Sequence, residues 1–129
     1  MKLGIVVSET YWDDITKPML DLALKTASEH ETHVLKVPGS YDIPLAVKKL
    51  LPSIDGVITL GAVVEGETDH DSMISYTVGK ALIDLSLEFM KPVVCGINGP
   101  KMSFSQGVAR INRAEKVTLA CIQMVNDLC

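Results

Sequence analysis

The sequence predicts an α/β protein with a central parallel sheet of four strands and helices on both faces. The chain of 129 residues contains four apolar runs of strand length, each followed by a segment of helical periodicity, and 47% of its residues are hydrophobic. Because the runs are apolar throughout rather than alternating, the strands should be buried on both faces, with right-handed crossovers between them. This length suffices for one core and is too short for two. We therefore expect a single-domain three-layer α/β/α sandwich over residues 1–129.

The first half of the chain supplies two strands and two helices. The apolar runs Leu3–Val7 and Thr32–Val37 are the strands. A helix is expected from about Asp13 to His30, with Pro18 tolerated only in its first turn. A second helix is expected over Ile43–Leu51.

The second half repeats this alternation with longer elements. The strands are predicted at Gly56–Val64 and Pro92–Ile97, and a helix is predicted from about Asp71 to Met90. The last helical pattern covers Phe104–Leu128, and a break near Arg110–Arg113 is left open. Strand and helix alternate along the whole chain, which is the pattern of a parallel sheet.

Charge and cysteine content exclude several classes of function. The formal net charge is −4, and no cluster of Lys and Arg offers a surface for nucleic acid. The cysteines Cys95, Cys121 and Cys129 are odd in number and lack metal-ligand spacing, so we expect reduced thiols, no metal and a cytoplasmic protein. The first apolar run is too short for a signal peptide or a membrane span. The high apolar content instead suggests burial between subunits.

The segment Gly61–His70 carries the strongest indication of chemistry. It runs from an apolar strand through a glycine-bearing turn to a histidine at the start of a helix. A helix N-terminus at the carboxyl end of a parallel strand suits an anion such as phosphate, with His70 beside it as a proton carrier. The alternative is an ordinary strand-to-helix turn in which Thr68 caps the helix and Asp71 completes the cap.

Two more segments follow predicted strands and should lie at the same edge of the sheet. Tyr11 and Trp12 are adjacent aromatics, and either can stack on a flat heterocycle or pack as a helix-entry staple. Further on, Gly39 permits a sharp turn, and Asp42 can accept hydrogen bonds from hydroxyl groups. Helix capping by Ser40 or Asp42 is the alternative there.

Three segments together resemble one enzyme family. They are Val37–Ala46, Gly61–His70 and Asp84–Glu88, and the match covers almost the whole chain in order. The chain is similar to the 6,7-dimethyl-8-ribityllumazine synthases, nearer to the archaeal members. The resemblance implies a flavodoxin-like fold. It also implies condensation of 5-amino-6-(ribitylamino)uracil with 3,4-dihydroxy-2-butanone 4-phosphate in riboflavin biosynthesis, without metal or organic cofactor.

The resemblance also implies roles for particular residues. His70 matches the histidine of proton transfer, a role that suits an imidazole near neutral pH. Tyr11 matches the stacking aromatic, and Asp42 falls where an acidic residue holds ribityl hydroxyls. The implied substrate-binding residues are Tyr11, Trp12, Ser40, Tyr41, Asp42, Ala62, Val63, Val64, Cys95 and Asn98. The implied phosphate-binding residues are Gly66, Glu67, Thr68 and Arg110.

Some positions depart from the family pattern in the substrate pocket. Trp12 stands where many members have asparagine, so Trp12 rather than Tyr11 is a second candidate for stacking. Cys95 stands where many members supply a phenylalanine to the neighbouring subunit, and a thiol covers less ring surface. That wall of the pocket is therefore expected to be thinner, or rebuilt from Ile97 and Asn98.

The proposed phosphate site carries an excess of negative charge. The carboxylates concerned are those of Glu65, Glu67, Asp69 and Asp71. They oppose an anion unless their side chains point outward, which leaves Arg110 as the main positive counterweight. Arg113 is the rival candidate if the last helix is shifted.

The resemblance further implies a homo-oligomer with active sites between subunits. The family forms pentamers, and twelve pentamers can close into an icosahedral shell; the short turn over Ala109–Glu115 favours the shell by analogy. Two alternative functions remain open: an archaeal-type riboflavin synthase, and a non-catalytic module that binds a flavin or lumazine. The segment Gly66–His70 speaks against the riboflavin synthase.

Overall fold

The computed structural model describes residues 1–129 and contains one sheet of four parallel strands, in the order β2-β1-β3-β4. The strands are Lys2–Ser8 (β1), Glu31–Val37 (β2), Gly56–Val64 (β3) and Val93–Met102 (β4). β1 and β3 are interior strands and are buried along almost their whole length, whereas β2 and β4 are the two edges. The predicted parallel sheet is confirmed.

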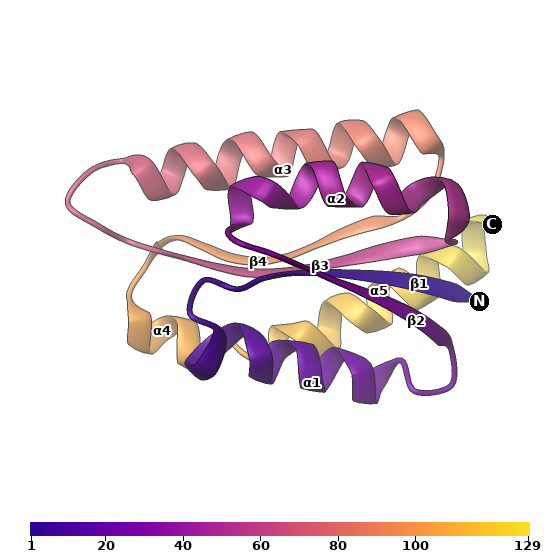
Figure 1. Cartoon of the computed structure of the whole chain (residues 1–129), viewed down its shortest axis with the longest axis horizontal. Helices are drawn as coiled ribbons and strands as arrows, with labels where there is room; N and C mark the ends of the chain where they lie inside the picture. Colours follow the sequence, from indigo (N-terminus) through magenta and orange to yellow (C-terminus); the bar gives the residue numbers. More distant parts are fainter.

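Helices cover both faces of the sheet (Figure 1). One layer holds α2 and α3, and the other holds α1 and α5, with the short α4 at the end of β4. The helices are Lys17–Thr26 (α1), Ile43–Leu50 (α2), His70–Phe89 (α3), Phe104–Ala109 (α4) and Arg113–Leu128 (α5). This is a flavodoxin-like three-layer sandwich, as predicted. None of its helices combines the length and apolar character needed to cross a bilayer.

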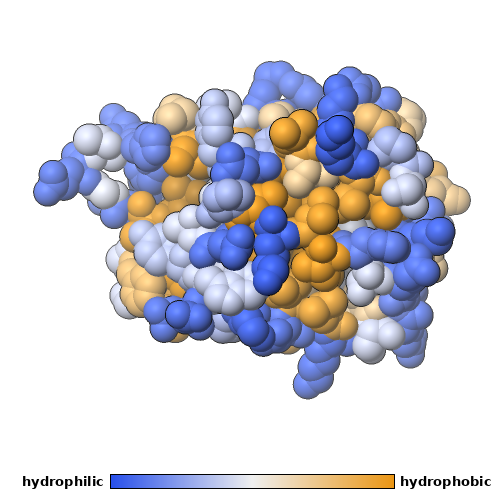
Figure 2. Space-filling model, viewed as in Figure 1, coloured by the Kyte–Doolittle hydropathy of each residue, from blue (hydrophilic) through white to orange (hydrophobic).

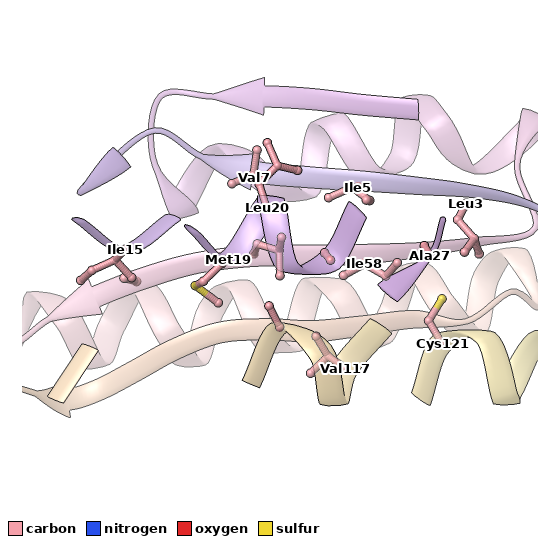
Figure 3. Close-up of a cluster of buried hydrophobic side chains, with 14 of the residues drawn as sticks. Leu3, Ile5, Val7, Ile15, Met19, Leu20, Ala27, Ile58, Val117 and Cys121 are labelled. Atoms are coloured by element: carbon pink, nitrogen blue, oxygen red, sulfur yellow. The ribbon is translucent and has the colours of Figure 1, made fainter. Parts of the chain in front are cut away.

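Two hydrophobic clusters hold the layers together, one on each face of the sheet. Leu3 and Ile5 of β1 belong to the cluster under α1 and α5, shown in Figure 3, while Val6 belongs to the cluster under α2 and α3. Val57 and Ile58 of β3 divide in the same way. Since successive side chains on a strand point to opposite faces, a strand between two helical layers must be apolar at every position.

The first helix is shorter than predicted. Residues Trp12–Thr16 form a π-helical turn, and α1 proper runs only over Lys17–Thr26 instead of reaching His30. Pro18 lies in the first turn of α1, where its missing N–H costs no hydrogen bond. The helix ends at Thr26 because Ala27 has left the helical conformation, with φ −96° and ψ 18°.

The last strand is longer than predicted, and the last helix is broken as anticipated. β4 continues past Ile97 to Met102, after a register shift opposite β3 between Ala62 and Val64. Beyond it, α4 and α5 are separated by a turn over residues 110–112. β4 thus extends further at its carboxyl end than its apolar residues indicate. The following helix α4 contacts β3 and the π-helical turn that follows β1.

Candidate active site

A cavity of about 450 Å³ opens at the carboxyl ends of β1, β2 and β3. Nine of the residues implied by the resemblance line it: Tyr11, Ser40, Tyr41, Ala62, Val63, Val64, Gly66, Thr68 and His70. A wider hollow of about 600 Å³ lies at the opposite end of the sheet, near Met1 and His30, and it contains none of these residues. We assign the candidate site to the cavity at the carboxyl ends, because ligands of parallel α/β sheets bind there.

Of the two adjacent aromatic residues, Tyr11 lines the cavity and Trp12 does not. Tyr11 adopts a left-handed conformation, with φ 60° and ψ 40°, at the entry to the π-helical turn. Its ring is 40% exposed and lies 5.6 Å from the ring of Phe104, centroid to centroid. Trp12 does not line the cavity, and the ammonium of Lys36 lies 5.0 Å from the centre of its ring. Strained backbone and π-turns both recur at functional sites.

Ser40 brings a free hydroxyl group to the cavity wall. Its side chain is only 7% exposed, and its Oγ has no hydrogen-bond partner in the protein. A Cβ atom on Gly61 would lie 2.7 Å from this Oγ, so the glycine is what leaves room for the hydroxyl. Buried polar groups are nearly always paired, so this buried and unpaired hydroxyl is an exception, and it belongs to a residue that lines the cavity.

Asp42 performs the capping role that was the alternative at this turn. Its Oδ2 accepts a hydrogen bond from the backbone N–H of Gly39 at 3.0 Å, within the short 3-10 turn Ser40–Asp42. The side chain does not line the cavity. The structure therefore shows Asp42 shaping the turn that presents Ser40 and Tyr41.

The start of α3 offers unpaired donors beside His70. The N–H of His70 donates to Oγ1 of Thr68 at 3.3 Å, whereas the N–H groups of Asp71 and Ser72 have no acceptor in the chain. These donors sit at the positive end of a 20-residue helix, which attracts anions. His70 is exposed and lines the cavity, so its imidazole can reach a bound ligand.

The acidic residues of this segment divide into two groups. Glu65, Glu67 and Asp69 are exposed, whereas Asp71 is only 6% exposed. Oδ2 of Asp71 accepts a hydrogen bond from the backbone N–H of Lys101 at 2.8 Å. Sequence reasoning assigned Asp71 to a helix cap and gave Lys101 no role; no signal in the sequence pairs two residues thirty positions apart.

A second hollow of about 320 Å³ adjoins the cavity and shares Gly66, Thr68 and Asp71 with it. Glu67 lines this second hollow rather than the main cavity. Lys101 also lines it, and its ammonium group forms no ion pair.

Three of the residues implied by the resemblance gather elsewhere, around the free edge of β4. Asn98 is 3% exposed, and its Nδ2 donates to the backbone carbonyl of Arg110 at 3.2 Å. Cys95 is exposed, and its carbonyl accepts from Nη2 of Arg113 at 3.3 Å. We call Cys95, Asn98, Arg110 and Arg113 the β4-edge cluster. None of them lines the cavity.

Metal-ligating side chains are not clustered in this chain. Nowhere do three His, Cys, Asp or Glu side chains lie close enough together to hold a metal ion. The polar groups of the cavity are one imidazole, the Asp71 carboxyl group, hydroxyl groups and backbone amides.

The fold and the cavity place the chain among α/β enzymes that hold a small ligand at the carboxyl ends of a parallel sheet. Residues 1–128 match the family model described as 6,7-dimethyl-8-ribityllumazine synthase. The chain belongs to this family, as its resemblance predicted.

Curated relatives with that name agree. The chain is 47% identical to the 6,7-dimethyl-8-ribityllumazine synthase of Picrophilus torridus, over 99% of this chain and 97% of the relative. It is 43% identical to that of Methanothermobacter thermautotrophicus, over 99% and 95% of the two chains. With that of Metallosphaera sedula it shares 51% identity over 86% of this chain and 76% of the relative.

Proposed function

We propose that this chain condenses 5-amino-6-(ribitylamino)uracil with 3,4-dihydroxy-2-butanone 4-phosphate to give 6,7-dimethyl-8-ribityllumazine, phosphate and water. The observation that carries the proposal is the convergence in one cavity of an aromatic ring, an unpaired buried hydroxyl group, and a histidine beside free helix-terminal amides. Family membership fixes the reaction, and these groups suit its two substrates.

The pyrimidine is assigned to the wall formed by Tyr11 and the end of β3. A flat heterocycle stacks well on a phenol ring, and the backbone over Ala62–Val64 offers polar groups to its edges. Ser40 lines this wall, and rotation of its buried hydroxyl toward the cavity would let it hydrogen-bond the pyrimidine or the start of its ribityl chain.

The butanone phosphate is assigned to the start of α3. Its phosphate would take the free N–H groups of Asp71 and Ser72, together with Gly66 and Thr68. His70 then lies beside the reacting carbons. Its imidazole transfers protons as the carbinolamine loses water and the imine loses phosphate, both of which require proton movement near neutral pH.

The β4-edge cluster supports a site that is shared between two copies of the chain. Arg110, the cation that the resemblance assigns to the phosphate, does not line the cavity of its own chain. We propose that Arg110 and Cys95 complete the cavity of a neighbouring subunit, with Asn98 buried behind them. A guanidinium arriving from the neighbour would balance the carboxylates of the segment 65–71.

Exposed apolar surface supports the same assembly. One stripe runs along α3, formed by Met73, Tyr76, Ile83 and Leu87. Figure 2 shows further hydrophobic residues gathered between the two helical layers, where the edge strand β2 runs with Val34 and Leu35 partly exposed. Apolar stripes of this extent are usually covered by a partner. We propose a pentamer, and sedimentation will separate it from an icosahedral shell.

Turnover tests the proposed reaction directly. The purified chain should form the lumazine, followed by its absorbance, from the two substrates alone and in the presence of a strong chelator. Formation of riboflavin from lumazine alone, or ligand binding without turnover, would contradict the proposal.

Mixing two impaired variants, assayed at a butanone phosphate concentration well below the KM of Arg110→Ala, tests the shared site. His70→Ala and Arg110→Ala chains are unfolded together in equal amounts, reassembled and assayed. If each site takes His70 from one chain and Arg110 from its neighbour, about one quarter of the sites regain both wild-type residues. Each variant reassembled alone is the control. If all residues came from one chain, the mixture would be no more active than the controls.

A further inference from the structure

The connection between β3 and α3 is fastened at both ends to two consecutive residues of β4. At its start, the N–H of Glu65 donates to the carbonyl of Met102 at 2.8 Å. At its end, the N–H of Lys101 donates to Oδ2 of Asp71 at 2.8 Å. No other hydrogen bond joins the residues between Glu65 and Asp71 to the sheet. This connection carries Gly66, Thr68 and His70.

Asp71 is the single charged residue among the buried ones. Burying a carboxylate costs solvation unless it is hydrogen-bonded, and bonds to an ionised acceptor are the stronger kind. Its partner Lys101 is held at φ 57°, a left-handed conformation that disfavours any residue with a side chain. The hydrogen bond thus joins the buried carboxyl group of Asp71 to the left-handed backbone of Lys101. Strained backbone positions of this kind are common at functional sites.

We propose that Asp71 is a positioning residue that sets the location of His70 through its bond to Lys101. The inference rests on the proposed role of His70 in proton transfer. His70 directly precedes Asp71, and its side chain is exposed, so burial contributes little to fixing its position. With the carboxylate of Asp71 fixed to β4, the first turn of α3 keeps its distance from the cavity wall formed by β3.

Two substitutions of Asp71 distinguish the effect of its hydrogen bond to Lys101 from the effect of its negative charge. Asp71→Ala removes the acceptor and should lower kcat by about ten- to a hundredfold, because small displacements of a catalytic group cost this much. The pyrimidine KM should change less than about twofold, since Tyr11 and Ser40 are untouched. Asp71→Asn keeps an oxygen that accepts from Lys101, and its kcat should stay within about threefold of the wild type. If Asp71→Ala does not assemble, Asp71→Ser, which is too short to reach Lys101, takes its place.

Two further variants test whether Asp71 acts through His70. Asp69→Ala removes an exposed carboxylate that forms no hydrogen bond, and its kcat should stay within about twofold of the wild type. In the double variant with His70→Ala, Asp71→Ala should lower kcat no further, because residues that act as a unit are not additive. The proposal is wrong if the fold decrease in kcat of the double variant equals the product of the two single decreases. It is also wrong if Asp71→Asn has a kcat as low as that of Asp71→Ala.

Amide hydrogen exchange tests the positioning role independently of turnover. Asp71→Ala should speed exchange at least tenfold in peptides covering residues 65–73 and 99–102, and Asp71→Asn should not. Unchanged exchange in Asp71→Ala overturns the inference. A wild-type chain without lumazine activity overturns the proposed function alone, because the exchange result still decides whether Asp71 fastens this segment.

Discussion

The side-chain amide of Asn98 donates a hydrogen bond to the backbone carbonyl of Arg110, 3.2 Å away. Asn98 lies on β4 and is almost wholly buried, while Arg110 is the exposed residue at the end of α4. β4 thus fixes the backbone position from which the guanidinium of Arg110 extends. Asn98, which the resemblance implied as a substrate-binding residue, holds the turn after α4 in this structure.

Asn98→Ala should therefore weaken the enzyme toward the phosphorylated substrate. Loss of one neutral hydrogen bond is worth about 1 kcal/mol, so the KM for the butanone phosphate should rise roughly fivefold. Steady-state kinetics with each substrate varied in turn measures this effect. A rise in the pyrimidine KM alone would instead indicate that Asn98 contacts the substrate directly.

Arg110→Ala should raise the KM for the butanone phosphate far more than that for the pyrimidine. Hydrogen bonds to charged groups contribute about 1.5–3 kcal/mol, which corresponds to roughly ten- to a hundredfold. Arg113→Ala is the matched control, because Arg113 already donates to the carbonyl of Cys95. A selective effect of Arg113→Ala alone would show that the phosphate takes the other arginine.

His70→Ala should lower kcat and leave pyrimidine binding largely intact. General acid–base groups contribute about 10²–10⁴-fold, and the lower end applies where two bound reactants also gain from proximity. His33→Ala is the control, since His33 lies on β2 and pairs only with Glu31. Full turnover of the His70 variant, or loss of pyrimidine affinity instead, would refute the assigned role.

Cys121 should be inert toward thiol reagents until the protein unfolds. Burial, and to a lesser degree Cys129, raises the pKa of its thiol to about 12, and only the thiolate reacts. In a Cys95→Ser/Cys129→Ser background, a thiol reagent at pH 8 should label the chain only after denaturation. Because the raised pKa favours the folded state below the unfolded value, stability should fall as the pH rises from 9 towards about 12. Rapid labelling of the folded chain would contradict this.

Met90→Gly should stabilise the protein. Met90 ends α3 in a left-handed conformation, with φ 53° and ψ 43°, where glycine is the favoured residue. Removing this strain is worth about 1 kcal/mol, visible as a higher Tm in thermal unfolding. Met90→Ala, which keeps the strain, should give no gain. A lower Tm for Met90→Gly would mean that the methionine side chain is packed in the assembly.

The sequence was sufficient for the succession of strands and helices along the chain. Unbroken apolar runs mark β1 and β3, which are buried on both faces, but the expectation of such burial is wrong for β2, an edge strand that is exposed at most positions. The prediction also failed at element ends, where local signals compete with tertiary contacts. Gly99-Pro100 is typical of the end of a strand, yet β4 continues to Met102, with an irregularity in which the four steps from Asn98 to Met102 lie opposite the two steps from Ala62 to Val64. The helix expected from Asp13 opens as a π-turn, which no periodicity indicates.

The features of the site also differ in how far the sequence could predict them. Residues that follow within a few positions of a strand end, such as Ser40 and His70, lie together at the cavity because the carboxyl ends of parallel strands share one edge of the sheet. Spacing could not choose between Tyr11 and Trp12, since a single left-handed residue decides which ring faces the cavity. The bond from Lys101 to Asp71 joins distant parts of the chain and shows only in three dimensions.

Trp12 is placed to serve as an intrinsic fluorescence probe of the cavity. It is the single tryptophan, so all indole emission comes from one position, next in sequence to the ring at the cavity. The ammonium of Lys36 over its face holds it in a defined environment. Any ligand that shifts Tyr11 also moves the π-turn that carries the indole. If the pyrimidine stacks on Tyr11 as proposed, its binding should therefore change the intrinsic fluorescence of the unlabelled protein, also in variants that no longer turn over.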